Sequence, residues 1–123
     1  MKKIHQPSSK NRFISGAVEA GGLVYFSGQV HADSDLNLHG ETIEEKFFYT
    51  MERIEENLAA ADLTKKDIIR LQIYVTDINE LPALNAEYAK YFEHPMPART
   101  AIGVTALPLG ASLEIDIIAA RSE

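Results

Sequence analysis

Residues 42–76 read TIEEKFFYTMERIEENLAAADLTKKDIIRLQIYVT. The first part of this stretch carries apolar residues at steps of three and four, which predicts a helix with one buried face. That apolar stripe consists of Ile43, Phe47, Met51, Ile54, Leu58 and Ala61. Thr42 and Glu45 have the spacing of a capping box, which predicts the helix start. Asp62 belongs to the few residue types that tolerate a left-handed conformation, so we expect the helix to end there.

The second part, residues 69–76, alternates between apolar and polar side chains. Leu71, Ile73 and Val75 fall on one face, and Arg70, Gln72 and Tyr74 fall on the other. Alternation with a period of two is typical of a strand that is buried on one side. A long helix followed by such a strand favours a layered structure of helices against a sheet.

Two further strands are predicted before the helix. Residues 13–20 and 23–27 are rich in apolar and aromatic side chains, and Gly21 and Gly22 between them suit a tight turn. We also consider a short strand at residues 2–5.

A second helix and two strands are predicted after residue 76. Asp77 or Asn79 caps the helix, and Pro82 is tolerated in its first turn. The apolar stripe of this helix is Leu81, Leu84, Tyr88 and Tyr91 or Phe92, and the prolines at 95 and 97 end it. Residues 99–107 and 112–120 read as the last two strands, joined by a turn around 107–110, and we expect them to pair as neighbours.

The element order is therefore β-β-α-β-α-β-β, an α+β architecture with two helices on one face of a single mixed sheet. The opposite face of that sheet has no cover in one chain. Tyr74, Ile118 and Ala120 are expected on it, and apolar groups of this kind favour burial against further copies of the chain.

The amino-acid composition excludes several classes of function. The 123 residues suffice for one domain, and 46% hydrophobic with 24% charged residues is typical of a globular protein. The absence of cysteine excludes disulfides, thiolate nucleophiles and iron–sulfur clusters. A net charge of −6 argues against general nucleic-acid binding. Residues 1–9 lack the apolar stretch of a signal peptide and no run is long enough to span a bilayer, so we expect a cytoplasmic protein.

Four residues of the polar segment 31–40 form a His/Asp cluster: His31, Asp33, Asp35 and His39. Imidazoles and carboxylates bind metals, but this spacing matches no strong motif and lies in a loop. We favour a solvated loop over a metal site. The glutamates of the first helix likewise favour a solvent-exposed face.

Three charged residues near the C-terminus are candidates for chemistry. Glu114 and Asp116 are two residues apart, so both point away from the face that carries Leu113 and Ile115. Outward solvent residues are the default interpretation, and an acid/base pair is the alternative. Arg99 is an exposed arginine by default, and its guanidinium fork fits a carboxylate in the functional interpretation.

Four motifs, taken together, resemble the RidA (YjgF) family. The segment PARTA at 97–101, followed by Leu107-Pro108 and by LEI at 113–115, resembles the C-terminal signature of that family. FSGQ at 26–29 is similar to its internal Ser-Gly-Gln strand end, LNAEY at 84–88 to its second-helix motif, and VTD at 75–77 also agrees. The resemblance covers the chain from about residue 13 to its end.

The resemblance implies a chorismate-mutase-like α+β fold, assembled as a homotrimer with ligand clefts between subunits. It also implies hydrolysis of reactive enamine and imine intermediates, of the 2-aminoacrylate type, to 2-oxo acids and ammonia. The family hydrolase uses no cofactor.

The family's functional residues match particular positions of this chain. Arg99 corresponds to the arginine that binds the substrate carboxylate, and Glu114 to the glutamate that orients or activates water. Ser27, Gly28 and Asn85 match substrate-binding positions. Two further pocket positions depart from the family pattern, because Ala101 stands where a cysteine is usual and Ile14 where a tyrosine is usual, unless a one-residue shift places Phe13 there.

Other functions of the same fold remain open. The losses of a thiol and a hydroxyl at Ala101 and Ile14 favour a non-catalytic ligand-sensing or protein-interaction trimer. A ribonuclease or translation inhibitor is disfavoured by the acidic charge. If the last two strands pair, position 104 opposes Glu114, and Arg99 is five residues out of line. That is roughly 17 Å at ~3.3 Å per residue, so we expect a site completed by a neighbouring chain or by a bulge.

Overall fold

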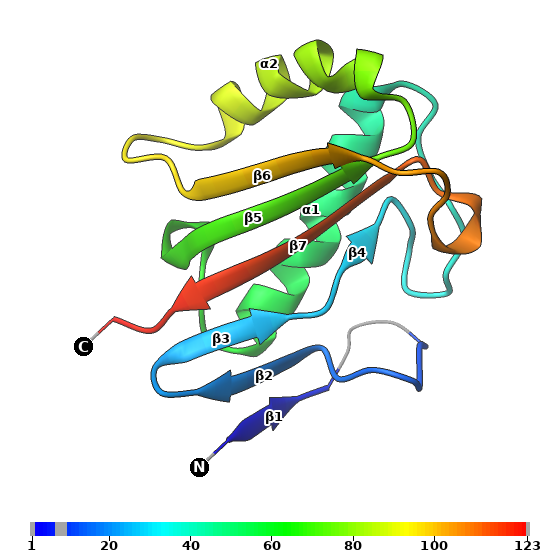
Figure 1. Cartoon of the computed structure of the whole chain (residues 1–123). Coiled ribbons are helices and arrows are strands. Elements are labelled where there is room, and N and C mark those ends of the chain that lie inside the picture. The colour runs from blue at the N-terminus through cyan, green and yellow to red at the C-terminus, as the bar shows by residue number, and fades with distance from the viewer. Residues whose placement is uncertain (1, 7–9, 123) are drawn as a thin grey trace.

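Figure 1 shows the computed structural model, which describes residues 2–6 and 10–122, as one mixed sheet with two helices. The strands are β1 (Lys3–His5), β2 (Ala17–Ala20), β3 (Leu23–Phe26), β4 (Gln29–Val30), β5 (Ile68–Val75), β6 (Ala98–Gly103) and β7 (Leu113–Ala120). The helices are α1 (Ile43–Ala60) and α2 (Leu81–Tyr91), with single 3-10 turns η1 (Lys65–Asp67), η2 (Ile78–Glu80) and η3 (Pro108–Gly110). We expected residues 1–9 not to form a signal peptide. Of that stretch, residues 1 and 7–9 lie outside the described residues.

The strand order is β1-β2-β3-β7-β5-β6, and β4 continues the β3 side of the sheet by pairing with β7. The β5–β6 pair is parallel and the other pairs are antiparallel. Figure 1 shows α1 behind the sheet and α2 along the β6 edge. The α+β prediction, with a single mixed sheet and two helices, is therefore confirmed.

The first helix forms as its sequence predicts. The Thr42 side chain accepts a hydrogen bond from the Glu45 amide, and the Glu45 carboxylate accepts from the Thr42 amide, so the capping box is complete. All six residues of the predicted stripe are buried. Asp62, just after the helix, has φ of 59°, which is the predicted left-handed terminator.

The core lies between the helices and one face of the sheet. Leu71, Ile73 and Val75 of β5 are fully buried on that face, as are Leu113 and Ile115 of β7. Leu84, Tyr88 and Phe92 close the core from the side of α2. No helix in the described part of the chain is both long and apolar enough to cross a bilayer.

The pairing expected for the last two strands is wrong, because β5 lies between β6 and β7. Arg99 pairs with Leu71 of β5, and Glu114 pairs with Tyr74 on the other side of the same strand. The physical reason is the helix between β5 and β6, since a strand, a helix and a second strand connect naturally as a parallel crossover. The apolar β7 then takes the central place, where both of its edges are paired.

Some predicted boundaries also shift. The strand expected at residues 13–20 is limited to β2, and Phe13 is 97% exposed. The strand expected at 99–107 ends at Gly103, and β4 was not predicted. Asp77 caps η2 by accepting from the Asn79 amide, and α2 follows directly. Gly21 and Gly22 have φ of 62° and 82°, which confirms the predicted tight turn between β2 and β3.

The face of the sheet away from the helices has no cover from the part of the chain that the structure describes. We call it the open face. An apolar row crosses it in register through Ile4, Val18, Tyr25 and Ile118. Ile4 and Tyr25 are about half exposed, and Tyr74, Ile118 and Ala120 are partly exposed, as the alternation predicts.

An arginine fork ties the C-terminal end of the chain to the body of the protein. Arg121 donates two hydrogen bonds to Glu19, at 2.7 and 2.9 Å, and one to the Ala61 carbonyl, at 2.9 Å. His5 lies 3.2 Å from the same carboxylate. The bonds from Arg121 and His5 lower the pKa of Glu19 to about 2.

Candidate active site

A cavity of about 370 Å³ opens beside the carboxylate of Glu114. Ile14, Ser27 and Gly28 line it together with Glu114, and Arg53 and Asp33 also contribute to its wall. Pro108 and Leu109 of η3 and Val30 of β4 add apolar surface. A cavity of this size with few polar groups in an apolar wall is typical of a small-molecule site.

Glu114 lies on the open face of the sheet, on β7, in contact with Gly28. A Cβ atom at Gly28 would lie 2.2 Å from Glu114 Oε2, so only glycine leaves room for this carboxylate. Burial, and secondarily the negative charge of Asp116, raise the pKa of Glu114 above its usual value. A carboxylate whose pKa is raised binds a proton more tightly, so it can accept one and return it during a reaction.

Ser27 lines the cavity next to Gly28. Its hydroxyl donates a 2.7 Å hydrogen bond to the Ser15 carbonyl, and its amide donates to the Gly16 carbonyl. These bonds fix the segment that carries Ile14, whose side chain presents apolar atoms to the cavity. Ser27, Gly28, Ile14 and Glu114, all expected at the site, are therefore together.

The remaining expected residues form a second group at the β6 edge. Arg99 Nη2 donates a 2.6 Å hydrogen bond to Asn85 Oδ1, and its guanidinium lies 4.7 Å from the centre of the Tyr88 ring. Ala101 lies two residues further along β6 and packs against the core. Asn85 and Tyr88 come from one face of α2, which orients the arginine from one side.

The two groups do not meet within one chain. Arg99 shares the helix-covered face with its partner Leu71, whereas Glu114 shares the open face with Tyr74. The two residues are three positions apart along β5, about 10 Å, and two strand spacings apart, about another 10 Å. The expected offset of five residues is thus corrected to three, but the separation and the opposite faces still keep them apart.

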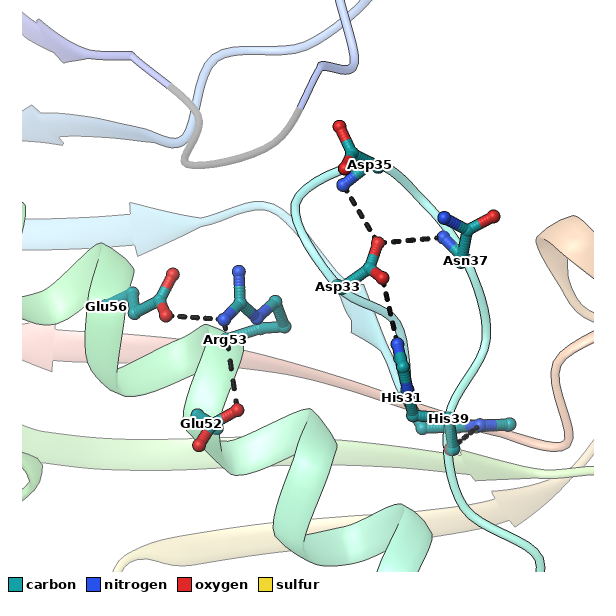
Figure 2. Close-up of polar contacts among 8 residues, drawn as sticks. All are labelled: His31, Asp33, Asp35, Asn37, His39, Glu52, Arg53 and Glu56. Atoms are coloured by element: carbon teal, nitrogen blue, oxygen red, sulfur yellow. Dashed lines mark hydrogen bonds and ion pairs between the residues drawn. The ribbon is translucent and has the colours of Figure 1, made fainter.

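The His/Asp cluster is used to shape its own loop (Figure 2). Asp33 accepts from the Asp35 and Asn37 amides and lies 2.8 Å from His39 Nε2, and these bonds lower the pKa of Asp33 to about 2. His31 is buried, with one ring nitrogen on the His39 carbonyl and the other on the Ser112 amide. Within the described residues, no group of three such side chains is placed to hold a metal.

Three residues have contacts that were not expected from the sequence. Tyr88 was placed in the apolar stripe and in the LNAEY motif but not beside Arg99, although its spacing of three from Asn85 places both on one side of α2. Arg53 and Asp33 line the cavity from α1 and from the loop after β4. Figure 2 shows Arg53 on α1 between Glu52 and Glu56, with its contacts to both made through Nη2. Arg53 and Asp33 are 20 residues apart in the sequence, and no local sequence pattern indicates that they line the same cavity.

Comparison with known proteins identifies the family. The model of a family described as "Endoribonuclease L-PSP" matches residues 3–121. The chain belongs to this family, also called RidA (YjgF). Its members include the Escherichia coli protein named "Putative reactive intermediate deaminase TdcF", which is 30% identical in an alignment of 129 positions that covers 99% of each chain.

Solved structures of RidA-family proteins agree with the fold. The crystal structure of E. coli TdcF with bound serine matches with a TM-score of 0.88 at 26% identity, over 98% of this chain and 99% of that one. A Schizosaccharomyces pombe relative, named "Protein mmf2, mitochondrial", is 37% identical over 108 residues, which cover 85% of each chain. The resemblance seen in four sequence motifs is therefore confirmed at the level of family and fold.

Proposed function

We propose that the protein hydrolyses reactive 2-imino and 2-enamino acids to 2-oxo acids and ammonia. The observation that carries the proposal is the pair of half-sites, an arginine oriented by Asn85 at the β6 edge of the sheet and a half-buried carboxylate in a cavity beside β7. The family relative named as a reactive intermediate deaminase supports the same chemistry.

Arg99 would bind the substrate carboxylate. In the described part of the chain, Asn85 is the acceptor bonded to Arg99, and it engages one of the five N–H donors of the guanidinium. The stacked Tyr88 ring restricts the rotation of that group. A planar fork that is already oriented matches two carboxylate oxygens and fixes the position of the adjacent imine carbon.

Glu114 would act on water. It takes a proton as the water oxygen bonds to the carbon of the protonated imine, and the C=N double bond becomes a single bond in a carbinolamine. Glu114 then returns the proton to the amino nitrogen. The C–N bond breaks as the hydroxyl gives its proton to Glu114 and becomes the carbonyl, so the 2-oxo acid remains and ammonia leaves, taking up that last proton as ammonium. The proposed reaction needs no cofactor or metal, because an imine conjugated to a carboxylate is already electrophilic.

The two half-sites require a neighbouring subunit, so we propose a homotrimer with clefts between subunits. The open face with its apolar row supplies surface to bury. Light scattering at micromolar concentration should give three times the subunit mass. A stable monomer would contradict the shared site.

Subunit mixing tests the shared site directly. Arg99→Ala and Glu114→Ala proteins should each be inactive, but co-expressed chains should recover activity. In a ring of head-to-tail contacts, about a quarter of the clefts in a random equal mixture combine an intact Arg99 with an intact Glu114. Each variant alone is the control, and mixed trimers without activity would rule out a site shared in this way.

We expect Ile14 and Ala101 to set which size of substrate side chain the protein prefers. These residues place apolar atoms where the family pattern has polar ones, and each buried methylene is worth ~0.8 kcal/mol. Pockets of this kind discriminate by roughly ten- to two-hundredfold per methylene. Imines derived from leucine or methionine should therefore be used at least as well as 2-iminopropionate, and Ile14→Tyr should shift the ratio of kcat/KM values back toward the smaller substrate.

Phe13→Tyr is the matched control for that variant. Phe13 is 97% exposed, so a hydroxyl added there should leave the ratio of kcat/KM values unchanged. A strong preference for 2-iminopropionate that Ile14→Tyr does not alter would show that position 14 does not set specificity.

A non-catalytic trimer that senses a carboxylate ligand is the principal alternative. It keeps the Arg99–Asn85 pair but requires no turnover. An assay that generates 2-aminoacrylate in situ and follows semicarbazone formation with and without the protein separates the two functions. Binding of a 2-oxo acid without any acceleration of imine loss would favour the sensing function.

Two further points concern the cellular location of the protein and whether it acts on RNA. We propose a cytoplasmic location, although the fission-yeast relative carries "mitochondrial" in its name. The family description names an endoribonuclease. The net charge of −6 is unfavourable for binding a phosphate backbone, so we do not propose RNA as a substrate.

A further inference from the structure

A second carboxylate accompanies Glu114 on the open face. Asp116 follows Glu114 by two residues on β7, so both side chains leave the same side of the strand. Tyr74 of β5 is paired with Glu114, and Gln72 is paired with Asp116. These four side chains form a polar group in the middle of the sheet, next to the apolar row.

Asp116 is fixed in this group by hydrogen bonding. The Tyr74 hydroxyl lies 3.0 Å from Asp116 Oδ2 and 2.8 Å from Gln72 Oε1, and its proton serves these two acceptors. Arg70, on the same face of β5, donates to Thr100 at 2.7 Å and adds a positive charge nearby. Burial raises the pKa of Asp116, whereas the Tyr74 bond and the Arg70 charge favour its ionised form.

The position of Glu114 is also restricted. Gly28 lies against its carboxylate from the β3–β4 connection and closes the side of the Glu114 side chain that faces that connection. The titratable or charged groups around Glu114 are Asp116 on β7, Tyr74 and Arg70 on β5, and Asp33 and Arg53 in the cavity wall. Asp116 is the one whose charge adds to burial in raising the pKa of Glu114.

We propose that Asp116 is a positioning residue, whose carboxylate, held by Tyr74, opposes a second negative charge at Glu114 and so lets Glu114 return the proton it takes from water. The inference rests on the proposed imine hydrolysis, and it assigns to Asp116 no contact with the substrate. A general base that binds its proton too weakly would not protonate the leaving amine, so a nearby anion improves the second half of the reaction.

The pH dependence of kcat/KM tests this role. Glu114 must be ionised to accept a proton, so kcat/KM falls as the pH falls through its pKa. Asp116→Asn removes the negative charge but leaves an oxygen for the Tyr74 hydroxyl, so the acidic limb should move to lower pH. Asp116→Glu restores the charge and should move the limb back. The loss of kcat in Asp116→Asn should stay well below the roughly 10²-fold loss expected for Glu114→Gln.

Asp62→Asn is the matched control, since Asp62 is exposed and asparagine tolerates its left-handed conformation. Asp62→Asn removes one negative charge, as Asp116→Asn does, but away from the cavity. The pH dependence of kcat/KM should therefore stay unchanged. Asp116→Ser supplies a second neutral variant if Asp116→Asn does not assemble as the unmodified protein does.

Carbon-13 NMR of labelled glutamate side chains provides a readout that needs no turnover, with Glu114→Gln identifying the Glu114 signal. The midpoint of the Glu114 titration should move to lower pH in Asp116→Asn and should be unchanged in Asp62→Asn. An unchanged midpoint and an unchanged acidic limb would overturn the role of Asp116. If no imine is hydrolysed at all, the proposed function fails, while the NMR titration still decides whether Asp116 acts on Glu114.

Discussion

Glu114→Gln is expected to lower kcat by about 10²-fold or more, with little change in the affinity for a 2-oxo acid product. Glutamine keeps the shape of the side chain beside Gly28, so the cavity should be preserved. It cannot accept a proton from water, however. The unmodified enzyme should lose kcat/KM as the pH falls through the raised pKa of Glu114, and the residual activity of the variant should lack that limb.

Steady-state kinetics with an imine generated in situ, together with titration calorimetry of a 2-oxo acid, would measure both quantities. Glu93→Gln is the control, because Glu93 is exposed and lies outside the cavity. Unchanged turnover in Glu114→Gln would leave Glu114 as a structural residue and would remove the basis of the proposed mechanism.

Arg99→Lys should lose most of the activity even though it keeps the positive charge. A single ammonium cannot present two parallel N–H groups to a carboxylate, and it cannot stack on Tyr88 as a planar guanidinium does. Both the substrate affinity and the alignment of the imine carbon should suffer, so kcat/KM should fall more than kcat. The measurement is the ratio of both parameters to those of the unmodified protein.

Arg121→Lys is a matched control for this substitution. Arg121 also uses its fork to bind a carboxylate, that of Glu19, but outside the cavity and away from Arg99. This variant should lower the thermal stability and leave kcat/KM in place. If Arg99→Lys retains near-normal kcat/KM, Arg99 does not bind the substrate carboxylate.

Local features of the fold could be predicted from the sequence. The α1 stripe repeats at steps of three and four residues, and its capping box and the terminator at Asp62 each depend on residues next to one helix end. The sidedness of Glu114 follows from alternation along a single strand, and it too is confirmed. Each of these properties is decided by neighbours in the chain.

Strand pairing could not be predicted in the same way. The neighbour of β7 was expected to be β6 because the two are adjacent in sequence, but β5 lies between them. The side of the sheet on which Arg99 lies depends on its partner Leu71, almost 30 residues earlier, and its alignment follows from contacts with α2. Family resemblance supplied the candidate residues of the site, whereas their division between two faces of the sheet required the structure.

The division of Arg99 and Glu114 between opposite faces has a consequence for how the activity responds to protein concentration. A sheet is a barrier that neither side chain can cross, so a dissociated subunit would hold both groups and yet complete no cleft. By mass action, the number of working clefts would then fall more steeply than the amount of protein on dilution. Specific activity would become a measure of association, and abundance within the cell would act as a threshold for imine removal.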